Sequence, residues 1–270
     1  MAASGIRLAW DPAQYGRFAD ARLRPVHDLI SQLGRLLPAA PKTIVDLGCG
    51  GGQATRLLAQ RFRTAKVTGL DADPAMLATA RLKSTGAQAA RVRYVRSDIV
   101  TWSPRTRVDV VFANASLHWV PGHETLFPRL IERVRRGGAL AVQMPLSLSQ
   151  PSHVLMRALA AEKPWRQWLA GLDPGMAVAE AADYDRWLAP HAVHLDIWQT
   201  TYLHGLQGPE PVANWTRGSG LRPYLAALPE DRRDAFFKAY ARLVAEAYPP
   251  TADGRVLYPF SRLFMVAVAR

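Results

Sequence analysis

Short apolar runs alternate with amphipathic stretches over the first half of the chain. Four of the runs have the length of strands, and each carries an acidic or amide residue at or near its end: Thr43–Leu47, Val67–Asp71, Val92–Ile99 and Val108–Asn114. The stretches that separate them repeat their apolar residues with the period of a helix. Strands that alternate with helices predict a parallel sheet covered on both faces. We therefore predict an α/β fold with a doubly wound, mostly parallel sheet.

The second half of the chain extends this sheet and adds helices. Further strands are expected at Ala139–Met144, Val193–Leu203 and Ser261–Arg270, which gives seven in all. A helix is expected over Gly122–Arg135, ended by Gly137-Gly138, because glycine commonly follows the last turn of a helix. The pattern divides the chain into an N-terminal lid and helix (1–40), a ligand-binding core (41–146), a helical cap insertion (147–192) and the end of the sheet with further cap helices (193–270). We expect a single structural domain plus a cap.

The glycine-rich turn after the first strand is the strongest chemical signal. Asp46 is followed by Gly48, Gly50, Gly51 and Gly52, and a predicted helix follows at once. Glycine adopts dihedral angles closed to other residues and leaves no Cβ between backbone and ligand. The turn can therefore present backbone N–H groups to a nucleotide-like molecule.

Acidic and amide residues at the ends of the next strands extend this site. Asp71 lies about twenty residues beyond the glycines, the spacing at which a carboxylate accepts hydrogen bonds from ribose hydroxyls. Asp98 can accept from an adenine amino group while Ile99 packs on the ring; the alternative for Asp98 is a helix or turn cap. Ligands bind at the carboxyl edge of open parallel sheets, so Asp46, Asp71, Asp98 and Asn114 are expected to converge on one crevice.

These motifs resemble class I S-adenosylmethionine-dependent methyltransferases, which have a Rossmann-like fold. The resemblance rests on the Asp-x-Gly-x-Gly turn, the acids after strands two and three, and the segment Asn114–Trp119. A closer resemblance, to the trans-aconitate 2-methyltransferase family, extends over most of the chain. Motifs that carry it include Trp10-Asp11-Pro12, Arg22-Leu23-Arg24-Pro25, Ala141–Pro145, His153–Arg157, Asp196-Ile197-Trp198, Gly220-Leu221-Arg222-Pro223 and Arg262-Leu263-Phe264.

The resemblance implies a set of ligand contacts. S-adenosyl-L-methionine would be the cofactor, S-adenosyl-L-homocysteine its product, and the binding residues would be Tyr15, Arg22, Asp46, Gly48, Gly50, Asp71, Ala72, Asp98, Ile99 and Asn114. Tyr15 would wall off the sulfonium, and Arg22 would reach the methionine carboxylate. The substrate would be bound by His118, Trp119, Gln143, Tyr202, Trp215, Arg222 and Arg262. A plain ion pair is the alternative for Arg222 and Arg262, and a surface position is the alternative for His118.

The implied reaction is methylation of a carboxylate of trans-aconitate, a small anionic polycarboxylate. A carboxylate with a pKa near 4 is already ionised at neutral pH, so no catalytic base is expected. A phenol or amine acceptor would need one, and His118 is then the candidate. Two other functions stay open from the sequence: methylation of malonyl-acyl carrier protein or another small acid, and a nucleic-acid-binding module with this fold.

Composition narrows the remaining possibilities. The net charge of +12 is spread over scattered arginines, whereas nucleic-acid binding usually shows as clustered basic residues, so no nucleic-acid partner is expected. Cys49 is the only cysteine, which excludes an internal disulfide and a thiolate metal cluster; packing is favoured over a nucleophilic role for it. We expect no metal site, no membrane segment and a cytoplasmic location, and the oligomeric state stays open.

Overall fold

The computed structural model describes residues 19–86, 89–172 and 175–270. Two compact units make up the chain. The larger, here called the sheet unit, comprises Arg22–Pro145, Gly175–Thr200 and Arg262–Arg270. Within the described residues, the smaller, here called the helical unit, comprises residues 19–21, residues 146–172 and Thr201–Ser261. The segment expected as a cap insertion therefore contributes to both units, and the four-part division remains a prediction.

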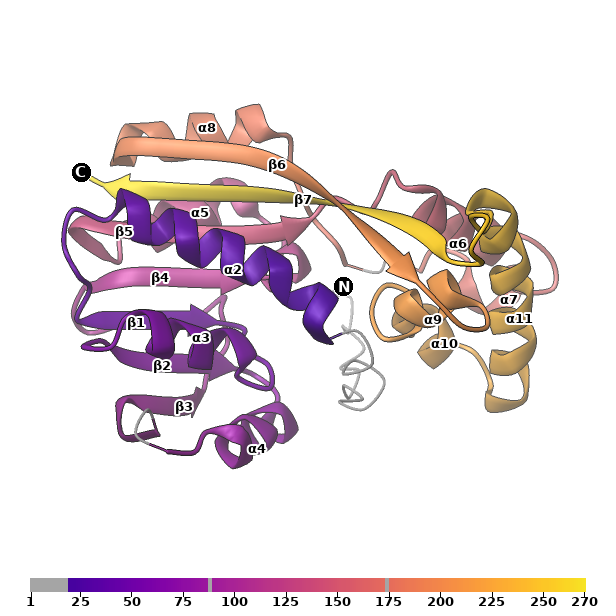
Figure 1. Cartoon of the computed structure of the whole chain (residues 1–270). Helices are drawn as coiled ribbons and strands as arrows, with labels where there is room; N and C mark the ends of the chain where they lie inside the picture. Colours follow the sequence, from indigo (N-terminus) through magenta and orange to yellow (C-terminus); the bar gives the residue numbers. More distant parts are fainter. Residues whose placement is uncertain (1–18, 87–88, 173–174) are drawn as a thin grey trace. The chain divides into compact units, whose positions relative to one another are not determined.

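A seven-stranded sheet organises the fold (Figure 1). Its order is β3-β2-β1-β4-β5-β7-β6. The strands are β1 (Thr43–Leu47), β2 (Lys66–Asp71), β3 (Val92–Arg96), β4 (Val108–Asn114), β5 (Val134–Pro145), β6 (Ala192–Leu206) and β7 (Val256–Ala269). The first five pair in parallel, and β7 pairs antiparallel with β5. The strand order reverses between β1 and β4, which is where open sheets of this kind bind ligands.

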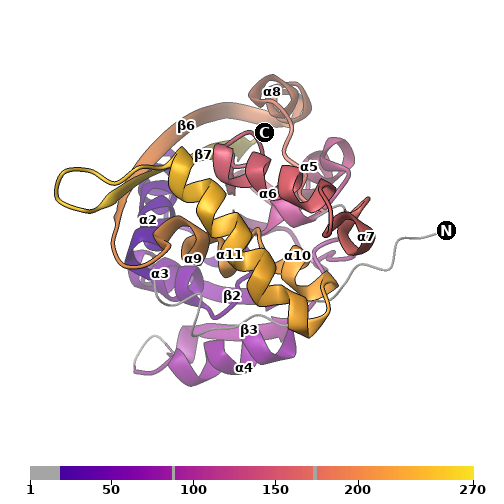
Figure 2. The same ribbon diagram turned by 90° about the vertical axis from the view of Figure 1, so that its right-hand side faces the viewer.

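Helices cover both faces of this sheet, as the doubly wound prediction requires. In Figures 1 and 2, α2 and α3 lie on one face and α5 lies on the other. The helices of the sheet unit are α2 (Ala19–Leu36, which begins in the helical unit), α3 (Gln53–Arg61), α4 (Pro74–Lys83), α5 (His123–Ile131) and α8 (Ala181–Leu188). Leu29 and Leu33 of α2 and Leu58 of α3 are fully buried, so the apolar faces of these helices form part of the core.

The helical unit has a separate aromatic core. It contains α6 (Pro151–Ala161), α7 (Arg166–Leu169), α9 (Pro211–Arg217), α10 (Arg222–Ala227) and α11 (Glu230–Ala247), and α6 lies alongside α11 (Figure 2). Trp215, Phe236, Tyr240 and Tyr258 are almost fully buried in it. Ser152 of α6 donates from its backbone N–H to the Tyr248 hydroxyl at 3.1 Å, and its carbonyl accepts from the Tyr240 hydroxyl at 3.1 Å.

The predicted helix over Gly122–Arg135 is wrong at its end. The helix stops at Ile131, and Gly137 and Gly138 lie inside β5. Gly137 has φ +74, and the pairing of β4 with β5 shifts register beside it. A side chain on Gly138 would clash with the backbone carbonyl of Asp109, so these glycines permit a close approach of two strands.

Other boundaries differ less. The third strand ends at Arg96, so Asp98 and Ile99 lie in the loop beyond it. Asp73 caps α4 with its side chain, and Pro74 opens the helix. Among the described residues, no helix is both long enough and apolar enough to cross a bilayer.

Candidate functional site

The centre of the site is the carboxyl group of Asp46. Asp46 lies in β1 and is 1% exposed, and the Thr55 hydroxyl of α3 donates to its Oδ2 at 2.6 Å. Burial raises the pKa of Asp46 to about 7; the Thr55 hydrogen bond opposes this shift, and the charge of Asp71 adds to it. A carboxyl group of this kind is poised to respond to a bound cation.

The glycine turn joins Asp46 to α3. Gly48, Gly50 and Gly52 all have positive φ angles, of 69°, 52° and 75°. A Cβ on Gly48 would clash with Ser116, and a Cβ on Gly50 would lie 3.2 Å from the Met76 Cε atom. The turn therefore requires glycine both for its backbone angles and for the closeness of its neighbours.

Asp71 joins the turn to the next helix. Its Oδ2 accepts from the backbone N–H of Gly50 at 2.8 Å, and its Oδ1 accepts from that of Asp73 at 2.9 Å. Burial raises the pKa of Asp71, and these two hydrogen bonds oppose the shift. Ala72 is exposed beside it. A carboxylate has about four acceptor positions, so Asp71 could still accept a hydrogen bond from a ligand hydroxyl.

Ile99 reaches the same turn, whereas Asp98 has a local partner. The Ile99 Cδ1 atom lies 3.4 Å from the position that a Cβ on Gly48 would take. Asp98 is exposed, and its Oδ1 accepts from the backbone N–H of Val100 at 2.8 Å. Asp98 therefore acts as the turn cap that was the alternative reading, and a role of its other oxygen in ligand binding stays a prediction.

Asn114, the last residue of β4, and Gln143, two residues before the end of β5, are register partners. Gln143 is fully buried. Its Oε1 and Nε2 atoms, and the Oδ1 of Asn114, find no hydrogen-bonding partner within the described ranges. Buried polar groups in folded proteins are nearly always paired. These atoms are therefore available to a ligand or an ordered water at this part of the sheet edge, and their role in binding stays a prediction.

The other predicted acceptor residues fall in both units. His118 and Trp119 form a 3-10 turn, η2 (Leu117–Trp119), with ring centroids 4.8 Å apart; His118 is 4% exposed, so the surface alternative is wrong. Arg262 is buried in β7 of the sheet unit. In the helical unit, the His204 ring stacks with both Tyr202 and Trp215, and Arg222 begins α10. Tyr15 lies outside the described residues, as does the side chain of Arg22.

Cys49 packs in the core. Its neighbours are Leu77, Ala80 and Tyr94, and burial raises the pKa of its thiol well above the usual range. Because the thiolate is the reactive form, the packing interpretation is the one that the structure supports.

Four supporting residues were not predicted from the sequence. They are Thr55, Ser116, His123 and Tyr184. The Ser116 hydroxyl donates to the Leu47 carbonyl at 2.7 Å, which fixes the chain after β4 to the glycine turn. Thr55 could have been predicted, because it lies in the first turn of the helix that follows Asp46 and the glycine turn. No local sequence signal marks the contact between His123 and Tyr184, which are 61 positions apart.

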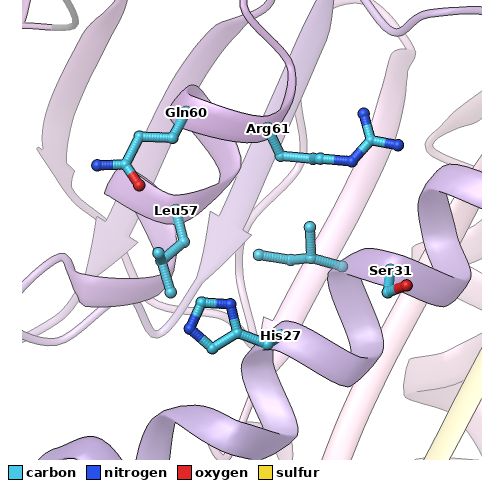
Figure 3. A pocket seen from close by; sticks show the side chains of 6 residues that line it. His27, Ser31, Leu57, Gln60 and Arg61 are labelled. Carbon is cyan, nitrogen blue, oxygen red and sulfur yellow. The ribbon is translucent and has the colours of Figure 1, made fainter.

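A separate hollow of about 350 Å³ lies between α2 and α3 (Figure 3). His27 of α2 and Leu57 of α3 point toward one another there, and Ile30, Ser31, Gln60 and Arg61 complete the lining. None of the predicted site residues lines it, so we do not assign it to the reaction.

The strand order, the glycine turn and the acids at the strand ends define a class I methyltransferase fold. The methyltransferase domain family matches residues 44–138. The YcgJ protein of Bacillus subtilis has a similar fold, with a TM-score of 0.56, 12% identity and coverage of 90% of this chain and 98% of that one. A coclaurine N-methyltransferase bound to N-methylheliamine and SAH gives a TM-score of 0.53 at 14% identity, over 90% and 72% of the two chains.

The sequence places the chain more narrowly. It is 46% identical over 259 residues to the trans-aconitate 2-methyltransferase of Methylobacterium nodulans, which covers 96% of this chain and 97% of the relative. The chain belongs to the trans-aconitate 2-methyltransferase family.

The buried carboxyl group predicts an unusual pH dependence of stability. Folding raises the pKa of Asp46 from 3.8 to about 7, so its ionisation destabilises the folded state as pH rises across this interval. Asp46→Asn should therefore be more stable than wild type at pH 8, by up to about 4 kcal/mol, and should lose this advantage toward pH 4. Urea unfolding of the ligand-free protein at several pH values measures the difference.

Asp109→Asn is the matched control. Burial raises the pKa of Asp109, but hydrogen bonds from Lys42 and Thr43 outweigh it and the net pKa is lowered. This variant should be less stable than wild type at pH 7, with a difference that shrinks below pH 4. A pH-independent effect of Asp46→Asn would contradict the assignment.

Proposed function

We propose that this chain transfers the methyl group of S-adenosyl-L-methionine to a carboxylate of trans-aconitate. The observation that carries the proposal is the 46% identity to a trans-aconitate 2-methyltransferase over nearly the whole of both chains. Family membership at this level extends through both the cofactor turn and the segments expected to bind the acceptor. The bound SAH in the coclaurine N-methyltransferase structure supports the choice of methyl donor.

The sheet edge fits the donor. Asp46, Gly48, Gly50 and Asp71 would hold it, with Ile99 beside the turn. A Cβ on Gly48 would lie 2.4 Å from the Ser116 Cβ atom, so the absence of a side chain there lets the turn pack closely against the segment that follows β4. The Asn114 Oδ1 atom and the Gln143 amide, which have no hydrogen-bonding partner in the described part of the chain, would supply hydrogen-bonding groups, and the raised pKa of Asp46 suits a ligand with positive charge.

The acceptor chemistry asks for alignment and no base. S-adenosyl-L-methionine supplies a methyl group on a sulfonium, which passes to the carboxylate oxygen as the sulfur keeps the electron pair of the broken bond. The acceptor is ionised at neutral pH, so no proton moves. The residues of the chain must exclude water and align the oxygen with the methyl group, and such positioning can contribute roughly 7–11 kcal/mol.

A direct assay tests the proposal. The purified chain is incubated with methyl-labelled S-adenosyl-L-methionine in four separate reactions, each with one acceptor: trans-aconitate, cis-aconitate, malonyl-acyl carrier protein or RNA. We expect a base-labile methyl ester on trans-aconitate, with much lower incorporation in the other three. Label on the carrier protein or on RNA, with none on trans-aconitate, would reject the proposal.

Arg222 is expected to hold a carboxylate of the acceptor. A planar guanidinium binds carboxylates in a bidentate manner. The backbone N–H of Arg222 donates to the carbonyl of Ser219, which precedes α10, at 3.1 Å, and this hydrogen bond fixes the backbone at the start of the helix. Arg222→Ala should raise the KM for trans-aconitate by roughly ten- to a hundredfold and leave donor affinity unchanged. Steady-state kinetics and calorimetry measure the two quantities.

Arg217→Ala provides the control, because Arg217 is an exposed arginine of the adjacent helix α9 that packs over Phe237. It should leave the KM near the wild-type value. Equal effects of the two substitutions would remove the role assigned to Arg222.

Gln143 offers a second test. Gln143→Met keeps the shape of the side chain and removes two buried polar atoms that have no partner in the described part of the chain. The ligand-free variant should be more stable by about 1–3 kcal/mol, while kcat/KM falls at least tenfold. Chemical unfolding and kinetics on the same sample decide it; a loss of both stability and activity would mean that Gln143 is only structural.

A further inference from the structure

The η2 turn, which carries His118 and Trp119, is fixed on one side by the glycine turn. The Ser116 hydroxyl donates to the Leu47 carbonyl at 2.7 Å, and Gly48 leaves no room for a side chain beside Ser116. Ala115, just before, has φ +50, an angle that a residue other than glycine rarely adopts. The start of η2 is therefore placed relative to the candidate cofactor site.

The other side of η2 is held by a chain of buried hydrogen bonds. His123 Nε2 lies 3.0 Å from the Leu117 carbonyl, and its Nδ1 lies 2.6 Å from the Tyr184 hydroxyl. The Tyr184 oxygen also accepts from the backbone N–H of Ala179 at 3.0 Å. A carbonyl can only accept, so the proton of the imidazole lies on Nε2 and Tyr184 donates to Nδ1.

The segment of residues 175–188, which contains Ala179 and Tyr184, also holds η2 directly. The backbone N–H of Ala177 donates to the His118 carbonyl at 2.8 Å. Residues 175–188 therefore secure the carbonyls of Leu117 and His118, one through the His123 and Tyr184 side chains and the other through the backbone. Phe127 fills the space beside both rings, with centroids 5.0 Å from His123 and 4.7 Å from Tyr184.

We propose that His123, held as the neutral Nε2–H tautomer by Tyr184, is a positioning residue that keeps His118 and Trp119 in place for the acceptor. The proposal rests on the proposed function, because it assumes that η2 borders the acceptor. It gives the segment after residue 174 a role: this segment fixes the acceptor side of the site without contributing a reacting group.

Only the neutral imidazole satisfies every member of this chain. Protonation of His123 would turn Nδ1 into a donor, so the Tyr184 hydroxyl would lose the acceptor of its own proton in this chain of hydrogen bonds. Burial lowers the pKa of His123, while its hydrogen bonds to backbone and the nearby Glu124 of α5 act in the opposite direction. On α8, Tyr184 has its pKa raised to about 12 by burial, and Asp183 lies beside it. Tyr184 therefore stays a hydrogen-bond donor throughout the neutral range.

Tyr184→Phe tests the proposal, since it removes one hydroxyl and keeps the aromatic packing. We expect the KM for trans-aconitate to rise roughly ten- to a hundredfold, with donor affinity within twofold of wild type. The variant should also acquire a pH dependence. Without the Tyr184 hydrogen bond His123 protonates more readily, so the KM should rise further between pH 8 and pH 6, where that of wild type stays constant.

Tyr248→Phe is the matched control. Tyr248 is another buried tyrosine whose hydroxyl accepts from a backbone N–H, that of Ser152, at 3.1 Å. The Tyr248→Phe variant should lose about as much stability as Tyr184→Phe but leave the KM for trans-aconitate and its pH profile unchanged. If Tyr184→Phe behaves in the same way as Tyr248→Phe, the role of His123 is structural and the proposal is overturned.

Nitrogen-15 NMR of the histidine rings in the wild-type protein gives a test that does not depend on a variant folding. We expect His123 to show a protonated Nε2 and an unprotonated Nδ1 from pH 6 to pH 8. A protonated Nδ1 would overturn the proposal. If wild type methylates none of the acids, the proposed function fails instead, and the ring tautomer still reports on the hydrogen-bond chain itself.

Discussion

Burial of the Asp46 carboxyl group is the constraint on which the site depends. Asp46 is 1% exposed, and the only side-chain hydrogen bond that it receives among the described residues comes from Thr55. For Thr55 to reach it, the chain must reverse between β1 and α3 within a few residues. The three left-handed glycines make that reversal possible. The shape of the turn is therefore a consequence of the Asp46–Thr55 contact, whether or not a ligand is bound.

The free protein holds unfavourable interactions at this edge of the sheet. Burial raises the pKa of both Asp46 and Asp71, and the Gln143 amide is buried without a partner in the described ranges. Each of these three polar groups lowers the stability of the free protein relative to an apolar side chain at the same position. A ligand with positive charge and hydrogen-bonding groups would reverse these costs on binding. Sites of this kind commonly sacrifice stability for function.

Local features of the fold could be predicted from the sequence, and contacts between distant residues could not. The strands β1 to β4 and the glycine turn follow from short apolar runs and clustered glycines, which act within a few residues. Gly137 and Gly138 misled, because glycine after an amphipathic stretch fits both a helix end and a strand irregularity. Only the approach of the Asp109 carbonyl decides between them. The contact of His123 with Tyr184 depends on tertiary packing of α5 against α8, so no sequence pattern predicts it.

The burial that raises the pKa of Asp46 also limits how an acceptor carboxylate can be methylated in such a protein. An environment that raises the pKa of Asp46 to about 7 would also raise the pKa of a buried acceptor carboxylate and favour its unreactive neutral form. Positive charge must therefore accompany the acceptor into the site. The sulfonium of the donor would supply it at the reacting oxygen, and arginine side chains would supply it at the remaining carboxylates. A catalytic base would therefore add nothing, because the acceptor carboxylate is already ionised in water and the site has only to keep it ionised.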